Sequence, residues 1–364
     1  MFQTVKFVLA ATAVATLVGC GGGGGGGGDG GGSGSGGGIA VTTLAGTGAN
    51  GSVDGAGANA TFSNPWGVAV DSSGTVYVAD AGNSPKIRKI SAAGVVSTLA
   101  GTGVQGSADG AGASATFASP MAVAVDSNGT VYVADAGNSP KIRKITAAGV
   151  VSTLAGTGVR GSTDGAGVNA TFDTPRGIAV DANGNVYVGD ESNFNIRKIS
   201  AAGVVSTLAG TGVQGSADGA GASATFYSVG GVAVDANGNV YVADAGNSKI
   251  RKITAAGVVS TLAGTGVRGS TDGVGVNATF SNPWGVAVDA NGNVYVADLG
   301  NNKIRKITAA GVVSTLAGTG APGSADGSGA SATFDWPHGV AVDTNGNVYV
   351  GDVSNKKIRK ITQQ

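Results

Sequence analysis

The sequence is poor in the residues from which most catalytic and metal sites are built. Its 364 residues include one histidine and one cysteine. A zinc site with several histidine ligands therefore cannot be assembled, and a disulfide within the chain cannot form. Charged residues make up only 12% of the chain, and the 22 basic residues balance the 22 acidic ones. This balance gives no reason to expect nucleic acid or an acidic surface as a partner.

Helical periodicity is absent beyond residue 20. After position 38, glycines alternate with short runs of Val, Ile, Ala and Tyr, which are typical of β-strands that bury a core. Residues 21–38 are different, because there only Asp29, Ser33 and Ser35 interrupt glycine. Such a segment cannot fold, and we expect a flexible tether with a reach of about 21–25 Å.

The first 20 residues have the pattern of an export signal. Lys6 precedes an apolar run over 7–18, which is shorter than the roughly 20 residues that a transmembrane helix needs. Leu-Val-Gly-Cys at 17–20 resembles the bacterial lipobox, in which the cysteine is acylated. The resemblance implies a lipid anchor at Cys20 in the bacterial cell envelope, and Gly21 after it favours the outer membrane. The alternative is a plain secretory signal that ends in cysteine.

The chain after the tether repeats at intervals of 54 or 55 residues. The repeat is marked by Phe62, Phe117, Phe172, Phe226, Phe280 and Phe334. In the unit that begins at Phe280, turn residues separate four predicted strands over 285–288, 293–297, 303–307 and 312–317. Four antiparallel strands make one propeller blade. The sequence therefore predicts an all-β, six-bladed β-propeller with four-stranded blades over 39–364.

The last unit lacks the counterpart of its fourth strand. That strand is found at the other end of the array, where Ile-Ala-Val-Thr-Thr-Leu-Ala-Gly at 39–46 matches Val-Val-Ser-Thr-Leu-Ala-Gly at 312–318. We expect the N-terminal strand to complete the last blade and close the ring, which removes both exposed sheet edges. A β-solenoid is the alternative architecture, although a solenoid has no reason to divide its repeat in this way.

Three motifs of each unit resemble the NHL-repeat family. In the first unit they are Pro-Trp-Gly-Val-Ala-Val-Asp at 65–71, Gly-Thr-Val-Tyr-Val-Ala-Asp at 74–80 and Lys-Ile-Arg-Lys-Ile at 86–90. The resemblance covers 39–364 and implies the propeller fold. Members of this family include interaction domains, extracellular sensor domains and an amidating lyase, and gluconolactonase-type propellers are neighbours. The resemblance therefore implies the fold more strongly than the function.

Most acidic residues recur at three positions of the repeat, which in the first unit are Asp54, Asp71 and Asp80. Chemistry does not need six copies of a residue. Equivalence around a ring favours turn capping and pairing with the arginine of each Ile-Arg-Lys-Ile strand over calcium binding or acid–base work. The tyrosines of Val-Tyr-Val, such as Tyr77, and the phenylalanines are predicted to fill the core between blades.

One position differs from unit to unit. It directly precedes the innermost strand, and the strand order places it at the mouth of the central channel. Its occupants are Trp66, Met121, Arg176, Gly230, Trp284 and His338. Irregular residues on the same face are Asp173, Glu191, Phe194, Tyr227, Asp335 and Trp336. An aromatic mouth with a few polar groups is typical of a small-molecule or peptide site, although unconstrained loops would also vary.

We therefore predict an exported, lipid-anchored scaffold that binds a protein, peptide or glycan. The candidate ligand-binding residues at the channel mouth are Trp66, Met121, Arg176, Glu191, Tyr227, Trp284, Trp336 and His338. A structural or adhesive surface domain without a discrete ligand is an alternative.

An enzyme is the second alternative. No nucleophile motif such as G-x-S-x-G accompanies His338, so no catalytic residue is assigned. No cofactor is expected, but a divalent cation such as calcium is compatible with the sequence. Asn64, Asp173, Glu191, Asn282 and Asp335 have the oxygen ligands that a metal-dependent lactonase or lyase would need.

Overall fold

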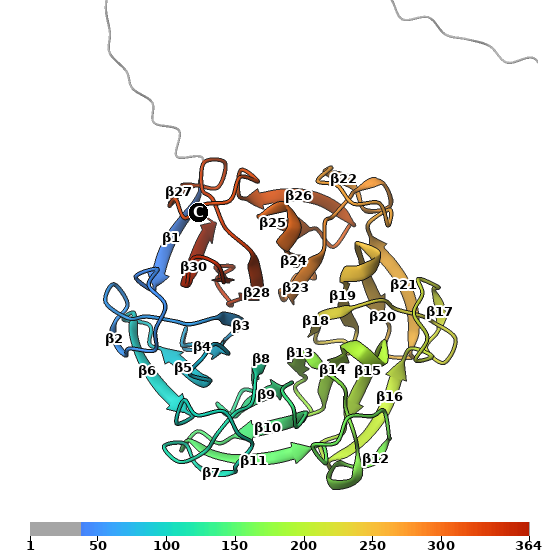
Figure 1. The fold of residues 1–364 in the computed structure, drawn as a ribbon. Coiled ribbons are helices and arrows are strands. Elements are labelled where there is room, and N and C mark those ends of the chain that lie inside the picture. The colour runs from blue at the N-terminus through green and yellow to red at the C-terminus, as the bar shows by residue number, and fades with distance from the viewer. Residues whose placement is uncertain (1–37, 364) are drawn as a thin grey trace, which may run out of the picture. The chain divides into compact units, whose positions relative to one another are not determined.

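The structure is a computed structural model that describes residues 38–363, and these residues form six antiparallel sheets arranged in a ring (Figure 1). The predicted export signal over 1–20, with Cys20, lies outside the described residues, as does the predicted tether except for Gly38. No helix within 38–363 has the length and apolar character needed to cross a membrane. The predicted all-β, six-bladed propeller is confirmed.

Each blade has the same strands in the same order from the channel outward, and blades 1 to 6 are numbered by their innermost strands. The innermost strands are β3 (Pro65–Val70), β8 (Pro120–Val125), β13 (Pro175–Val180), β18 (Val229–Val234), β23 (Pro283–Val288) and β28 (Pro337–Val342). The second strands are β4 (Val76–Asp80), β9 (Val131–Asp135), β14 (Val186–Asp190), β19 (Val240–Asp244), β24 (Val294–Asp298) and β29 (Val348–Asp352). The third strands are β5 (Lys86–Ile90), β10 (Lys141–Ile145), β15 (Asn195–Ile199), β20 (Lys249–Ile253), β25 (Lys303–Ile307) and β30 (Lys357–Gln363).

The fourth strands are β6 (Val95–Ala100), β11 (Val150–Ala155), β16 (Val204–Ala209), β21 (Val258–Ala263), β26 (Val312–Ala317) and β1 (Ile39–Ala45). The fifth, outermost strands are β2 (Gly55–Ala56), β7 (Gly110–Ala111), β12 (Gly165–Ala166), β17 (Gly219–Ala220), β22 (Gly273–Val274) and β27 (Gly327–Ser328). Short 3-10 turns are η1 (Gly167–Asn169), η2 (Glu191–Asn193), η3 (Ala245–Asn247), η4 (Gly275–Asn277) and η5 (Leu299–Asn301).

The predicted count of four strands per blade was wrong, because each blade has a fifth strand. This strand comes from the Asp-Gly loop, which sequence patterning treats as a turn. In blade 1 the loop folds back along the outer strand, so that Gly55 pairs with Val96. The carboxylate of Asp54 also accepts a hydrogen bond from the backbone N–H of Thr98 at 2.9 Å. The loop thus covers part of the sheet edge that four strands would leave open.

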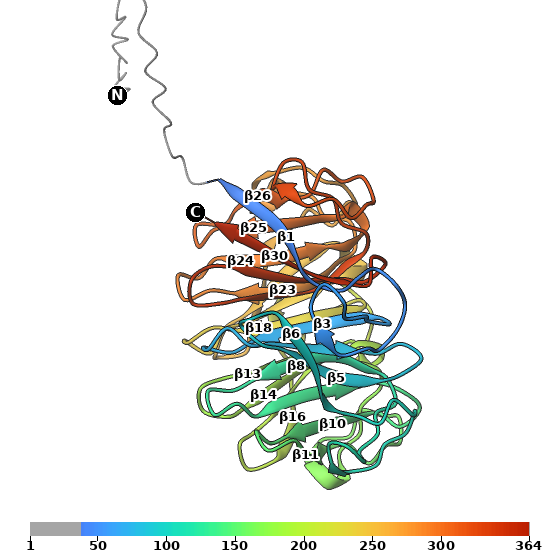
Figure 2. The ribbon, with the colours of Figure 1, turned by 90° about the vertical axis from the view of Figure 1, so that its left-hand side faces the viewer.

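The ring closes through two strands from opposite ends of the described chain. β1 pairs antiparallel with β30, and Figure 2 shows the two strands side by side in blade 6. Val41 lies opposite Ile361 and is 1% exposed. This confirms the predicted closure and excludes the solenoid.

The hydrophobic core lies between neighbouring blades. Tyr77 of blade 1 packs in one buried cluster with Phe117 and Val131 of blade 2, and the other blade pairs have equivalent clusters. Sheets that carry small and large side chains on their facing surfaces can pack against each other in this way around a circle. The prediction that the tyrosines and phenylalanines fill the space between blades is confirmed.

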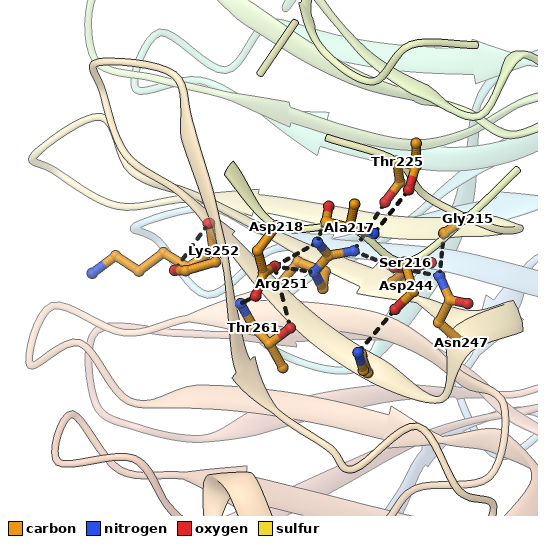
Figure 3. A network of polar contacts seen from close by, with 12 residues as sticks. Gly215, Ser216, Ala217, Asp218, Thr225, Asp244, Asn247, Arg251, Lys252 and Thr261 are labelled. Atoms are coloured by element: carbon orange, nitrogen blue, oxygen red, sulfur yellow. Dashed lines mark hydrogen bonds and ion pairs between the residues drawn. The ribbon is translucent and has the colours of Figure 1, made fainter. Parts of the chain in front are cut away.

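A buried arginine holds each blade to its own outer loop, as Figure 3 shows for blade 4. The guanidinium of Arg251 donates hydrogen bonds to Asp218 at 2.6 Å and to Asp244 at 2.7 Å, and its Cζ lies 5.1 Å from the ring centroid of Phe226. It also donates to the carbonyl oxygens of Ala217 and Thr225. Pairing of the two repeated aspartates with the repeated arginine is therefore confirmed.

The third repeated aspartate caps the turn between the first two strands. In blade 1, Asp71 accepts hydrogen bonds from the backbone N–H groups of Ser73 and Thr75, and from the hydroxyl of Tyr77. Burial raises the pKa of Asp71 in part, but these hydrogen bonds outweigh it and lower the pKa below its ordinary value. The carboxylates predicted to be structural thus have structural partners.

The connections define two faces of the ring. The face that carries the connections between blades, such as residues 46–64, is called the long-loop face, and the opposite one is the hairpin face. Inner strands line a channel whose hollow toward the hairpin face is about 170 Å³, lined by Val68, Ala69, Val70 and their equivalents. Toward the long-loop face the hollow is only about 50 Å³. There a Cβ added at Gly67 would lie 2.6 Å from the Cα of Ala122, so neighbouring strands come very close.

Candidate functional site

The six inner strands each begin at the long-loop end of the channel, and their second residues meet around its axis. Trp66, Met121, Arg176, Trp284 and His338 occupy five of these positions, and Gly230 occupies the sixth. These five side chains, together with Glu191, are called the channel-end cluster. The predicted convergence at the channel mouth therefore holds for six of the eight candidate residues.

Arg176 is the centre of the cluster. It extends from blade 3 toward side chains of blades 1 and 5, with its Cζ 6.0 Å from the ring centroid of Trp66 and 5.5 Å from that of Trp284. Its Nη1 also lies 3.6 Å from the sulfur of Met121. Guanidinium groups at such distances from indole faces are attracted by the ring quadrupole. The side chain therefore connects blade 3 with side chains of blades 1, 2 and 5.

Glu191 neutralises this arginine. It lies in η2, directly after β14, and its Oε2 accepts a hydrogen bond from Nε of Arg176 at 2.7 Å. The hydroxyl of Ser228 donates to the other oxygen at 2.9 Å. The side chains of Arg176 and Glu191 are 22% and 18% exposed, so the ion pair is partly desolvated and still reaches the surface.

His338 supports the aromatic side of the cluster. Its ring lies edge to face against Trp66 and tilted against Trp284, with 5.1 Å between the centroids of the latter pair. Burial lowers the pKa of His338 well below its ordinary value, and the positive charge of Arg176 lowers it further, while a hydrogen bond to the backbone of Trp66 opposes both. The imidazole is therefore neutral, and within residues 38–363 its Nε2 has no hydrogen-bond partner.

The cluster concentrates residue types that the chain otherwise lacks. Glu191 is the only glutamate and His338 the only histidine of the sequence, and two of its three tryptophans are here. The other aspartates and arginines of the blades mostly repeat in equivalent structural roles. The channel end is thus where the ring departs most from its own symmetry.

Two candidate residues lie outside the cluster. Tyr227 is 39% exposed and faces Phe194, with 6.3 Å between ring centroids. Trp336 is 55% exposed, and its φ of 56° lies in the left-handed region. The prediction that all eight residues line one mouth is therefore met only in part. Both residues nevertheless belong to the long-loop face, because they lie in the connections between blades.

Three of the five oxygen ligands considered for a cation contact basic side chains. Asp173 forms an ion pair with Arg160 at 2.8 Å, and Glu191 pairs with Arg176. The amide oxygen of Asn64 accepts a hydrogen bond from Nζ of Lys356 at 2.8 Å. In the part of the chain that the structure describes, no three His, Cys, Asp or Glu side chains are grouped as metal ligands would be.

Sequence reasoning missed Ser228, which fixes the free oxygen of Glu191. Serine at this position carries no sequence signal, since it also suits the turn before an inner strand. Its φ of 53° shows that it occupies the same left-handed turn position as Thr174, Asn282 and Trp336. Only the assembled ring shows that this turn faces the loop containing Glu191.

Comparison with known families identifies the repeats. The sequence profile described as NHL repeat matches residues 62–84, 226–253, 280–307 and 334–361, and that of the teneurin NHL domain matches 159–218. The chain is 30% identical over 282 residues to Protein SUPPRESSOR OF QUENCHING 1, chloroplastic, of Arabidopsis thaliana. This alignment covers 72% of this chain and 27% of that protein. It is 31% identical over 294 residues to human NHL repeat-containing protein 2, covering 70% and 40%. The chain thus spans less than half the length of these relatives.

Solved structures share the fold at low sequence identity. A protein of unknown function from Bacteroides thetaiotaomicron matches with a TM-score of 0.70 and 22% identity, covering 90% of this chain and 76% of that one. An auxiliary nutrient binding protein of the same organism matches with a TM-score of 0.66 and 18% identity. The match covers 89% of this chain and 76% of that one. A gluconolactonase from Xanthomonas campestris matches with 0.57 and 13%, covering 89% of both chains. At these identities the likeness shows the fold alone.

Proposed function

Since the chain is a six-bladed propeller that contains NHL repeats, we propose that it is a binding scaffold whose ligand docks on the long-loop face over the channel-end cluster. The observation that carries the proposal is the convergence of the single histidine, the single glutamate and two tryptophans at the place where the ring departs most from its repeat. Stability of a repeated ring does not require such a departure. A few polar groups set among aromatic side chains are what a ligand site needs.

The proposal includes export and attachment to the cell envelope through a lipid on Cys20. The lipobox resemblance supports it, and a tether of mostly glycine between the anchor and β1 would leave the ring free to meet its ligand. A nutrient-binding protein among the structural neighbours is compatible with this role, although that likeness extends to the fold alone.

A screen for ligand-induced stabilisation tests the proposal. The full-length protein is heated with panels of amino acids, peptides and soluble polysaccharides, and its Tm is recorded for the wild type and for Arg176→Met. A ligand that binds the folded state must raise Tm in proportion to its saturation. We expect at least one class to stabilise the wild type, and the variant to lose most of that shift. If no class stabilises the wild type, or Arg176→Met responds equally, the proposed site is wrong.

A metal-dependent lactonase or lyase at the channel end is the second candidate. The gluconolactonase with this fold shows only that a six-bladed ring is compatible with such chemistry. Against it, Asp173 and Glu191 are each engaged by an arginine. Metal analysis of the purified protein separates the two functions. A stoichiometric divalent ion that disappears in Glu191→Gln together with Asp173→Asn would favour the enzyme.

A further inference from the structure

Trp336 has a left-handed backbone conformation and an exposed side chain, and both are unfavourable for a tryptophan. Its φ of 56° is in the left-handed region, which bulky residues avoid because Cβ crowds the backbone. The equivalent left-handed positions of blades 3, 4 and 5 hold the small polar residues Thr174, Ser228 and Asn282. The indole is also 55% exposed. Folding stability therefore gives no reason for a tryptophan here, and strained residues of this kind are often functional.

The backbone of Trp336 is nevertheless held on both sides. Its N–H donates to the side-chain oxygen of Asn302 in blade 5 at 3.1 Å, and its carbonyl oxygen accepts a hydrogen bond from the N–H of Val353 at 3.3 Å. The turn is therefore fixed to two neighbouring loops while the indole remains open to solvent. Such an arrangement presents a rigid aromatic surface, which loses little conformational entropy when a ligand stacks on it.

Aromatic and polar groups of the long-loop face come from different blades. Trp284, Trp336 and Trp66 come from blades 5, 6 and 1, which are consecutive in the closed ring. Arg176, Glu191 and Ser228 come from blades 3 and 4. The indoles of Trp66 and Trp284 lie beside Arg176, so the aromatic and hydrogen-bonding groups meet at the channel end.

The charges of the channel-end cluster cancel, and so do those of one further ion pair on this face. Arg176 pairs with Glu191, Arg160 pairs with Asp173, and His338 is neutral. Nη2 of Arg176 donates no hydrogen bond to any residue within 38–363, so its N–H groups are available to a ligand. The channel-end cluster therefore favours a ligand without net charge that has an apolar surface and several oxygen acceptors.

We propose that this ligand is a carbohydrate, with one sugar ring stacked on the indole of Trp336 and hydroxyl groups bound by Arg176. A pyranose ring has a face of C–H groups that suits the negative face of an indole, and its hydroxyls suit a neutral ion pair. The inference rests on the binding function proposed above and narrows it to one class.

A peptide fits the face less well. Extended peptides are usually recognised at an open sheet edge or by pockets for their side chains. Here the fifth strand covers part of each outer edge, and the hollow beneath the channel-end cluster is only about 50 Å³. The exposed indole of Trp336 and the neutral channel-end cluster offer neither an open sheet edge nor pockets for peptide side chains.

Affinity electrophoresis tests the inference, with native gels containing soluble starch, dextran, xylan, galactomannan or mixed-linkage β-glucan. The variant is Trp336→Asn, which places in blade 6 the residue that blade 5 uses at Asn282. We expect at least one polysaccharide to retard the wild type, and the variant to bind it about tenfold or more weakly. Its Tm should equal or exceed that of the wild type, because Asn tolerates the left-handed conformation. Val104→Asn, which removes an exposed apolar side chain from another loop, is the matched control and should bind normally.

Two outcomes would overturn the carbohydrate inference. One is a wild type that no polysaccharide retards, and the other is a Trp336→Asn variant that is retarded as strongly as the wild type. A protein that is stabilised by peptides and not retarded by polysaccharides would refute this inference and leave the proposed binding function standing. If Trp336→Asn lowers Tm, Trp336→Phe replaces it, and its smaller ring should give intermediate retardation.

Discussion

The imidazole of His338 meets the indole of Trp66 edge to face, with 4.3 Å between ring centroids and an interplanar angle of 85°. This contact joins blade 6, which is the blade completed by the pairing of β1 with β30, to blade 1 at the channel end. The edge-to-face arrangement is favourable for a neutral ring, and a charged imidazole in this buried position would have to be desolvated.

We expect the stability of the wild type to depend on pH through His338. Its folded-state pKa is depressed from the ordinary 6.5, so the unfolded chain takes up the proton first as pH falls. The contribution of neutral His338 to the free energy of unfolding is fully present above about pH 6.5 and is lost as pH falls through the folded-state pKa. The free energy of unfolding, measured with urea at pH 7.5 and pH 5.5, should drop more for the wild type than for His338→Phe. Equal drops would contradict this.

Arg176 and Glu191 should be coupled only moderately in stability. Both side chains are partly exposed, so solvent screens the pair, and a double-mutant cycle with Arg176→Met and Glu191→Gln should give about 1 kcal/mol or less. Urea denaturation of the four proteins provides the numbers. A coupling of several kcal/mol would indicate that the pair is a structural support and would weaken its assignment to a ligand site.

The buried arginines of the third strands should contribute far more to the free energy of unfolding than Arg176 does. In Arg197→Met, Asp190 loses the guanidinium that lies 3.0 Å away and stays buried, which costs about 3–5 kcal/mol near neutral pH. Burial raises the pKa of Asp190 to about 6 even with the arginine present, so the loss should shrink at pH 5, where the carboxyl is protonated. Arg160→Met is the control, because its pair with Asp173 is exposed and should be worth about 1 kcal/mol at most.

The closing strand should be as firmly packed as an internal one. Val41 in β1 and Val96 in β6 occupy equivalent buried positions, each 1% exposed. Replacement of either by Ala should cost about 2 kcal/mol of unfolding free energy. Thermal unfolding of the two variants measures this. A much smaller loss for Val41→Ala would mean that β1 frays from blade 6.

Lipid attachment at Cys20 can be tested in cells. Growth with an alkyne-bearing fatty acid should label the wild type, and Cys20→Ser should remain unlabelled because it lacks the only thiol of the chain. Fractionation of the same cells should place the wild type with membranes and the variant in the soluble fraction. Equal labelling of the two proteins would rule out the anchor.

Local patterns were sufficient to predict the fold. The strands predicted over 303–307 and 312–317 have the observed bounds of β25 and β26, and Gly292 and Gly311 occupy the predicted turns with φ of 78° and 79°. These features depend on residues close together in sequence. The fifth strand was missed because two residues after an aspartate carry no strand pattern.

The site could be predicted only as a set of positions. Equivalence in the repeat places Trp66, Arg176 and Trp284 at one end of the channel, but it does not tell which of these side chains touch one another. The pairing of Arg176 with Glu191 depends on side-chain length and on an irregular turn after β14. The backbone of Trp336 was also unpredictable, because nothing in its neighbouring residues requires a left-handed conformation.

The pairing of Ile39 with Gln363 in blade 6 has a consequence for architecture. The first and last strand residues of the ring lie directly opposite each other. The two ends of the propeller are therefore close together in space. A ring of this kind can be inserted into a larger protein without stretching or reorganising the host.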